Sequence, residues 1–189
     1  MPETILGNVI QIDVFKDLDA SDYVLLEGPQ TDVEGTLTLA ATGSNSVVSL
    51  SDTNLYAWCE SYFIIDATGL NSTVSIAGSH LFLQGSSQLP EESYFEVSAD
   101  GEGSGISISN SYLYSNYDSA GAETSVKILS QGSGSNINLN NVHLSTSIVA
   151  GEGESDVLIS ASGAGSTINA KDIVILFEGT GNFGGPLTS

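Results

Sequence analysis

Residues 126–141 read VKILSQGSGSNINLNN, and this stretch decides the fold. Val126 and Ile128 alternate with polar residues before a Gly-Ser-Gly-Ser sequence, and Ile137 and Leu139 alternate after it. A period of two is typical of a β-strand that buries one face. The stretch therefore predicts two short strands joined by a tight corner.

The same pattern recurs along the chain without gaps. Five segments begin at intervals of 26, 32, 31 and 31 residues, at Leu37, Phe63, Phe95, Val126 and Val157. The tenth residue of every segment is serine, and the seventh is glycine: Gly43, Gly69, Gly101, Gly132 and Gly163. Fixed turn residues in every repeat indicate stacked structural units.

Each unit has a third apolar position, filled by Leu55, Leu81, Leu113, Leu144 and Ile175. Three residues earlier stand types that tolerate left-handed backbone angles: Asp52, Gly78, Asn110, Asn141 and Asp172. A second corner therefore separates a second strand from a third. Like strands would pair between units at ~4.8 Å. We predict an all-β fold, a single-stranded right-handed parallel β-helix (β-solenoid) of about five three-strand coils plus an N-terminal cap. An ordinary β-sandwich is the alternative, but it has no reason to keep turn residues at fixed positions.

The register also divides the chain. We assign residues 1–35 to an N-terminal cap or imperfect first coil, because alternating Ile10 and Ile12 indicate a strand there. The predicted solenoid spans residues 36–179, and residues 180–189 form a Gly-rich C-terminal tail. Its coils are 36–61, 62–93, 94–124, 125–155 and 156–179. The last coil is expected to present an open strand edge, which fits either a longer protein or an assembly surface.

The charge balance excludes several functions. The chain has 23 acidic residues against three lysines and no arginine, a formal net charge of -20. Nucleic-acid binding and adsorption to anionic membranes both need clustered Lys or Arg. No apolar run approaches the ~20 residues of a transmembrane helix. The single Cys59 cannot form an internal disulfide. We therefore expect no nucleic-acid partner and no membrane insertion.

Rings gather at outward positions of the predicted third strands. We name four of them the aromatic stripe: Tyr56, Phe82, Tyr112 and Tyr114. His80 and His143 share the column of Tyr112. An exposed apolar stripe usually marks a partner site, and both protein contact and stacking on sugar rings would use it. These six residues are the candidates for partner contact; burial of the stripe under the variable loops is the alternative.

Metal sites find little support in the sequence. His80 and His143 lie two coils apart, roughly 9.6 Å by strand spacing, which is too far to bind one zinc ion. Asp17, Asp19 and Asp22 form a weak calcium candidate, because the run lacks the glycine and glutamate of a calcium loop. A solvated acidic turn is the alternative. We expect no cofactor.

The β-helix families that process polysaccharides carry recognisable catalytic residues. Pectate lyases rely on Arg or Lys, polygalacturonases on Gly-His-Gly and Arg-x-Lys strings, and pectin methylesterases on an arginine beside two aspartates. This chain has none of those strings and no arginine. Asp66 and Glu96 could meet the carboxylate spacing of a glycosidase, but nothing distinguishes them from the other acids. We expect a protein without enzymatic activity and assign no catalytic residue.

Two segments carry a family resemblance. Residues 103–115 (GSGISISNSYLYS) and 132–147 (GSGSNINLNNVHLSTS) resemble the passenger repeats of bacterial autotransporters and filamentous-haemagglutinin-type adhesins. Those repeats also read Gly-Ser, alternating apolar residues, an Asn corner and a third strand. The resemblance covers residues 36–179 and concerns the fold. It implies a right-handed β-helix outside the cell or at its surface, although Met1–Thr4 lacks the start of a signal peptide and the export route is not predicted.

These observations give one expected function and two alternatives. We expect a structural or interaction protein, an extracellular or cell-surface β-solenoid that associates with itself as a filament or surface-layer subunit, similar to an adhesin. The first alternative is a glycan-binding module of an adhesin or phage fibre, and the second is a polysaccharide hydrolase. The expected partners are further copies of the chain, another surface protein or a glycan.

Overall fold

The computed structural model describes these ranges: residues 3–7, 9–12, 36–52, 54–58, 62–85, 92–117, 123–148 and 154–179. Every regular element in these ranges is a β-strand. Among the described residues, no helix has the length and hydropathy needed to cross a membrane.

One face of the molecule is a six-stranded parallel sheet, which we call sheet A. Its strands follow in spatial order as β1 (Glu3–Gly7), β3 (Thr36–Thr42), β6 (Tyr62–Thr68), β9 (Glu92–Asp100), β11 (Glu123–Gln131) and β13 (Glu154–Ser162). Pairing is in register, so that Val126 lies between Phe95 and Val157. Strands from successive repeats therefore lie side by side, as the repeat predicted.

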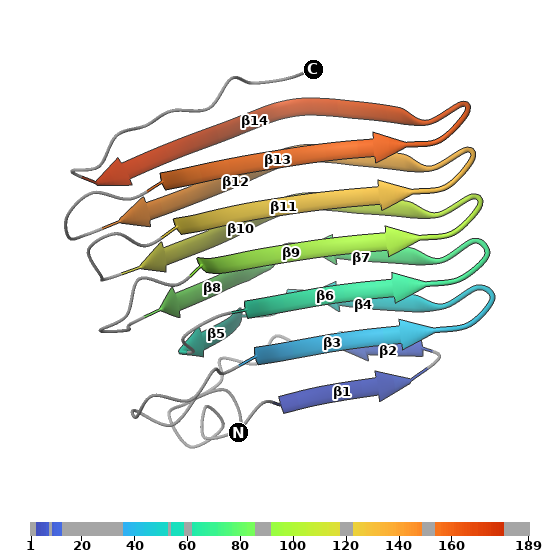
Figure 1. The fold of residues 1–189 in the computed structure, drawn as a ribbon, viewed down its shortest axis with the longest axis horizontal. Coiled ribbons are helices and arrows are strands. Elements are labelled where there is room, and N and C mark those ends of the chain that lie inside the picture. The colour runs from blue at the N-terminus through green and yellow to red at the C-terminus, as the bar shows by residue number, and fades with distance from the viewer. Residues whose placement is uncertain are drawn as a thin grey trace.

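The opposite face is an eight-stranded parallel sheet, which we call sheet B. Its main path is β2 (Val9–Ile12), β4 (Val47–Ser51), β7 (Thr73–Ala77), β10 (Gly105–Tyr117), β12 (Asn136–Ile148) and β14 (Thr167–Gly179). Two short strands, β5 (Asn54–Trp58) and β8 (His80–Gly85), extend the sheet beside β10. In Figure 1 the chain crosses the front in sheet A from left to right, returns behind it in sheet B and climbs at each circuit, so the solenoid is right-handed.

The predicted fold class is thus confirmed, and the coil count differs slightly from the prediction. Sheet A has six strands where five repeats were counted, because β1 pairs in register with β3. Likewise β2 pairs in register with β4. The sequence analysis assigned this pair to a cap or imperfect first coil, because neither strand is followed by the glycine and serine of the repeat.

The corner between sheets A and B depends on stacked glycines. Gly101 has a φ of 136°, and a Cβ atom there would overlap the carbonyl oxygen of Gly69 one coil below. Gly132 and Gly163 are placed in the same way over the glycine beneath them. The repeat glycines therefore form a column in which backbone packs directly on backbone. The repeat serines support this corner from inside; the Ser104 hydroxyl, for example, donates to the Gln131 carbonyl at 2.8 Å.

The second corner forms at the predicted residues but does not always end a strand. φ is positive at Asp52, Gly78, Asn110, Asn141 and Asp172, between 48° and 59°. We predicted separate second and third strands in every coil. Instead β10, β12 and β14 pass through the corner as bent strands, and only β4/β5 and β7/β8 are split. The left-handed residue at each of these corners is left out of the strand pairing. The residues before and after it stay paired in register with the adjacent strand.

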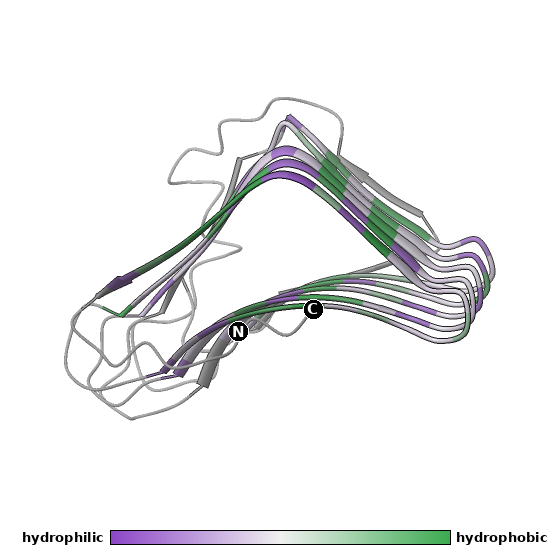
Figure 2. Ribbon diagram, turned by 90° about the horizontal axis from the view of Figure 1, so that it is seen from above, coloured by the Kyte–Doolittle hydropathy of each residue, from purple (hydrophilic) through white to green (hydrophobic). Residues whose placement is uncertain are grey.

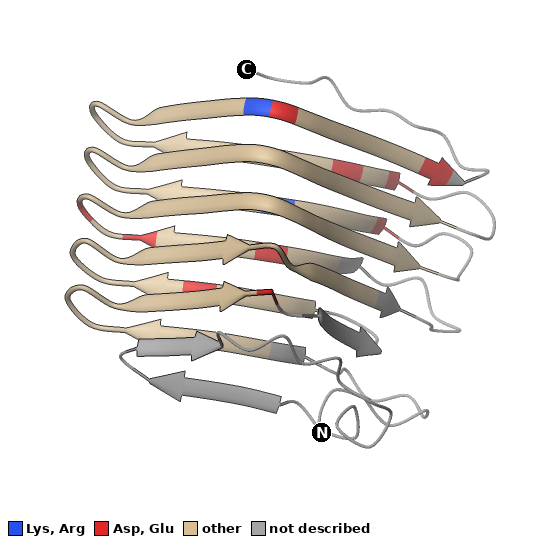
Figure 3. Cartoon of the chain, turned by 180° about the vertical axis from the view of Figure 1, so that it is seen from behind, with Lys and Arg blue, Asp and Glu red and all other residues tan. Residues whose placement is uncertain are grey.

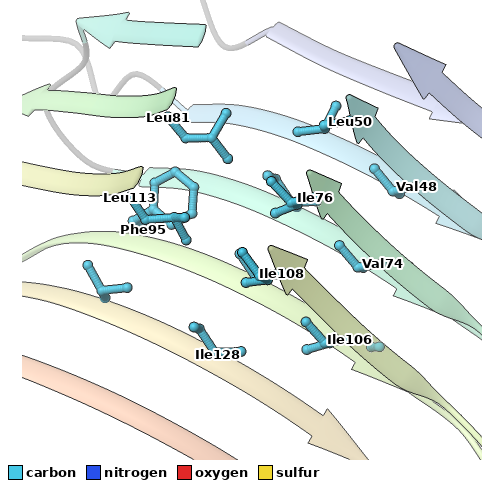
Figure 4. Packing of buried hydrophobic residues seen from close by; sticks show 14 of the residues in the cluster. Val48, Leu50, Val74, Ile76, Leu81, Phe95, Ile106, Ile108, Leu113 and Ile128 are labelled. Carbon is cyan, nitrogen blue, oxygen red and sulfur yellow. The ribbon is translucent and has the colours of Figure 1, made fainter. Parts of the chain in front are cut away.

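The core lies between the two sheets. In Figure 2 the hydrophobic positions of successive strands, coloured green, line up as bands across the stacked coils. Phe63 and Phe95 pack edge to face in one column, with ring centroids 4.6 Å apart. Figure 4 shows Val74, Ile76, Ile106 and Ile108 directed inward from neighbouring strands of sheet B. All of these side chains are at most 1 % exposed. Full burial of such a side chain contributes ~1.5–3 kcal/mol, so the columns are the main source of stability.

Candidate functional site

Three members of the aromatic stripe, Phe82, Tyr112 and Tyr114, lie at partly exposed positions of β8 and β10. Tyr112 pairs in register with His80 below and His143 above, and Tyr114 pairs with Phe82. The Phe82 and Tyr114 rings stack with centroids 4.5 Å apart. The Tyr112 ring lies 6.4 Å from His80 and 6.0 Å from His143. Parallel register thus gathers five of the six candidate residues on one face.

The sixth candidate, Tyr56, pairs in backbone register with Phe82 and so belongs to the same column. Its side chain lies outside the described residues. Of the five placed side chains, His80 is exposed and the other four are partly exposed. Part of the ring surface is therefore open to a partner.

The hydroxyl of Tyr114 has a shifted pKa, and burial of the side chain is the largest cause. Burial raises the pKa of its hydroxyl above the ordinary value, while a hydrogen bond with the Ser147 side chain acts in the opposite direction. The Glu178 carboxylate adds a smaller upward effect on the same pKa. Burial therefore favours the neutral Tyr114 phenol, which can form hydrogen bonds beside the rings.

A second ring cluster, on the outer face of sheet A, was missed by the sequence analysis. The Tyr62 and Tyr94 rings lie 4.2 Å apart between centroids, and the Lys127 ammonium lies 4.1 Å above the Tyr94 ring. Such a cation–π contact contributes ~0.5–1 kcal/mol at an exposed site. The signal was present, because a Tyr-Phe pair stands at the start of the apolar alternation in both repeats.

A column of glutamates was also missed. Glutamate stands three residues before the start of every repeat, and we call these five residues the glutamate column: Glu34, Glu60, Glu92, Glu123 and Glu154. Strands β9, β11 and β13 begin with its members Glu92, Glu123 and Glu154, which are register partners. Glu34 and Glu60 lie outside the described residues. Glutamate thus recurs at the first residue of successive sheet A strands along the solenoid axis. Figure 3 colours the described acidic positions of the chain red.

The carboxylates considered for glycosidase chemistry, Asp66 and Glu96, lie on adjacent strands of sheet A, two register positions apart. Register puts Glu96 beside Ile64 and puts Asp66 beside Ser98. Asp66 accepts hydrogen bonds from the Ser98 hydroxyl at 2.9 Å and from the Thr68 hydroxyl at 2.7 Å. This carboxylate is therefore engaged in holding the surface of sheet A.

The structure describes only some of the residues on which the metal predictions rest. The weak calcium candidate at Asp17, Asp19 and Asp22 lies outside the described residues. Within the ranges that the structure describes, no three His, Cys, Asp or Glu side chains lie close enough to hold a metal ion.

The last described coil exposes side chains whose register partners in the coil below are buried. Strands β13 and β14 are the final strands of both sheets. Ile168 is 46 % exposed and Phe177 is 40 % exposed, although their register partners Ile137 and Thr146 are fully buried. These side chains belong to the inward columns, and no described coil lies above them. These apolar side chains of β14 are therefore not covered by any coil that the structure describes.

Comparison of the chain with protein-family models, with curated proteins and with solved structures gave no match.

Proposed function

We propose that this protein is a structural, non-enzymatic β-solenoid that associates end to end with further copies of itself. Its setting would be the cell surface or the extracellular space, in line with the resemblance of its repeats to autotransporter passengers and filamentous-haemagglutinin-type adhesins. The observation that carries the proposal is the exposed apolar end formed by β13 and β14.

Backbone geometry supports a second copy as the partner. All strands of a sheet run parallel, so the outer edge of β13, where no described strand pairs, has the hydrogen-bonding pattern that the outer edge of β1 can complete. The same relation holds between β14 and β2. A second copy in the same orientation would therefore continue both sheets at once. Unpaired edges of this kind promote association with another chain.

The inward register positions support the same partner. Ile5 in β1 is the register partner of Leu39, and Ile10 in β2 is the register partner of Val48. Both positions belong to the inward columns of their sheets. In a stack, Ile5 and Ile10 would stand over Ile159 and Ile168 of the copy below. Contact between unlike ends does not close on itself, so the expected product is a filament.

The proposal is tested by mass and shape measurements on the purified chain. Sedimentation and negative-stain microscopy should show linear particles that lengthen with protein concentration. Ile168→Glu places a charge in the joint and should reduce the association constant at least about tenfold. Leu70→Glu is the matched control, because Leu70 is 48 % exposed at a corner away from both ends. Monodisperse single chains at every concentration would rule the proposal out.

A glycan-binding function is the second candidate, and the stacked stripe favours it. Phe82, Tyr112 and Tyr114 offer ring surface, and His80 and His143 offer hydrogen-bonding groups beside it. Aromatic rings beside polar groups are typical of sites that hold ligands with both apolar and polar surfaces. Alanine at Phe82 and Tyr112 should abolish retention on glycan arrays and leave particle mass unchanged. Loss of assembly with unchanged glycan retention would contradict this candidate.

A further inference from the structure

Two tyrosine rings on neighbouring coils are in direct contact on the outer face of sheet A. Tyr62 in β6 and Tyr94 in β9 are Cα partners in parallel register, so both side chains leave the same face of the sheet side by side. Their ring centroids lie 4.2 Å apart, with an angle of 38° between the ring planes. This separation is slightly shorter than the range of about 4.5–7 Å that is usual for aromatic pairs.

The Tyr94 ring is also contacted from the opposite direction. Strand β9 lies between β6 and β11 in sheet A, and the Lys127 ammonium of β11 lies 4.1 Å from the Tyr94 ring centroid. Tyr94 therefore has Tyr62 in the coil below it and Lys127 in the coil above it. Both tyrosine side chains are only partly buried. The two phenols are thus held together and remain accessible to a dissolved reagent.

The other described tyrosines are less well placed to react with one another. Tyr112 and Tyr114 are two positions apart on one strand, with ring centroids 6.1 Å apart. Phe82 stacks on Tyr114 at 4.5 Å, but phenylalanine has no hydroxyl group. Tyr117 is fully buried. In the part of the chain that the structure describes, the sheet A pair therefore brings two accessible phenols closest together.

Phenols in contact can be coupled by oxidation. A one-electron oxidant removes one electron from each ring, and each phenolic proton passes to water, which leaves two tyrosyl radicals. A carbon–carbon bond then forms between the ring carbons next to the two hydroxyl groups. The hydrogen of each bonded carbon is transferred through water to the oxygen of its own ring, which restores both phenols. In total the pair loses two electrons and two protons, which one molecule of hydrogen peroxide accepts to form two molecules of water.

Contact between the rings favours this coupling over reaction between chains. Groups held in place within one molecule react as if each were present at about 10⁵–10⁸ M, provided that the reacting atoms come within about 3–3.5 Å. Rings whose centroids are 4.2 Å apart need only a small rotation to reach that separation.

We infer that Tyr62 and Tyr94 are the site of an oxidative cross-link, a dityrosine bond that forms when a peroxidase with hydrogen peroxide acts on the protein. The bond joins two successive coils and closes a loop of about 30 residues, so it restricts the unfolded chain as a disulfide does. The single Cys59 cannot provide such a bond within the chain. The inference is independent of end-to-end association, because both tyrosines belong to one chain.

The test oxidises the purified full chain with a peroxidase and limiting hydrogen peroxide, at a protein concentration that keeps chains separate. Dityrosine fluorescence should appear, and the intact mass should fall by two hydrogen atoms. Glu91 and Glu92 stand between the two tyrosines, so a glutamate-specific protease places them on different peptides. Mass spectrometry should then find these two peptides joined. The cross-linked chain should melt roughly 10 °C higher than the untreated chain.

The variants keep every ring and remove single hydroxyl groups. Tyr62→Phe should lower the yield of the cross-link within the chain at least about tenfold. Tyr112→Phe is the matched control, because Tyr112 is a partly exposed tyrosine of sheet B, and it should leave the yield unchanged. Oxidation in concentrated urea should lower the yield as Tyr62→Phe does, since the unfolded chain no longer holds the rings in contact. An unchanged yield in Tyr62→Phe, an equal yield in urea, or bonds only at other tyrosines or between chains would each overturn the inference.

Discussion

The coil formed by β11 and β12 and the coil formed by β13 and β14 share one sequence pattern and differ in their neighbours. Ile137 and Ile168 are register partners of the same residue type, yet Ile137 is fully buried and Ile168 is 46 % exposed. Val126 is likewise fully buried, whereas its partner Val157 is only partly buried. Burial in a solenoid is therefore conferred by the next coil and not by the coil's own sequence.

This difference makes stability a sum of contacts between adjacent coils, as in other repeat proteins. A change in the middle disturbs two interfaces, and the same change at the end disturbs one. Paired substitutions at equivalent positions can test this reasoning directly.

The largest effect is expected at the glycine column. Gly132→Ala would drive a Cβ atom into the Gly101 carbonyl, so we expect a loss of about 3 kcal/mol or more in the free energy of unfolding. Gly134→Ala is the control, because nothing lies within 4 Å of its added Cβ and only a positive φ opposes it. Its cost should be ~1–2 kcal/mol. Equal losses in denaturant unfolding would show that backbone stacking at the corner is unimportant.

The second effect compares the two isoleucines. Ile137→Ala should cost ~2–5 kcal/mol, because it leaves a cavity in a closed core. Ile168→Ala should cost less than ~1 kcal/mol in the separate chain, since almost half of that side chain is already in water. Urea unfolding under conditions that keep chains separate measures both. If the two variants lose the same stability, the end coil is covered in solution.

The third comparison pairs a substitution that should lower the free energy of unfolding with one that should raise it. The buried Ser115 and Thr124 hydroxyls are bonded at 2.8 Å across the interior, so Ser115→Ala should cost ~1–3 kcal/mol by leaving Thr124 without that partner. Thr146 is the register partner of Ser115 one coil above, and its buried hydroxyl has no hydrogen-bond partner. Thr146→Val should therefore stabilise the protein, by up to about 1 kcal/mol. Thermal melting of the two variants should move in opposite directions; a fall for Thr146→Val would contradict the assignment.

The smallest effect is a pH dependence. The pKa of Tyr114 is raised by burial above its ordinary value of about 10, so the neutral phenol is favoured in the folded chain. The associated stability is fully present below pH ~10 and is lost as pH rises through the folded-state pKa. The free energy of unfolding should thus decrease above pH ~10, with a shallower slope in Tyr114→Phe. Identical slopes from pH 9 to 11 would show that Tyr114 titrates alike in both states.

The fold could be predicted because its determinants are local and repeated. Alternation fixes which face each strand buries, and the glycine and Asn or Asp corners need backbone angles that few residues adopt. The continuity of β10, β12 and β14 could not be predicted, because the pairing on either side of the corner depends on the adjacent coils.

The candidate site was predictable in position but not in extent. Repeat spacing placed Phe82, Tyr112 and Tyr114 on one face, since equivalent residues must stack in a parallel solenoid. The Tyr94–Lys127 contact was not predicted, because it joins different repeat positions of adjacent strands. The glutamate column was legible in the sequence, but it lies before the apolar alternation that defined the repeat.

Variation in repeat length is confined to one side of the solenoid. The passage from the third strand back to sheet A takes three residues after Trp58 and six after Gly85, whereas the glycine corner has the same length in every repeat. Added residues at the variable passage leave the backbone register untouched. A peptide grafted between Tyr117 and Glu123 would accordingly be displayed at a fixed height on the scaffold, and grafts in successive coils would form a ladder with a step of ~4.8 Å.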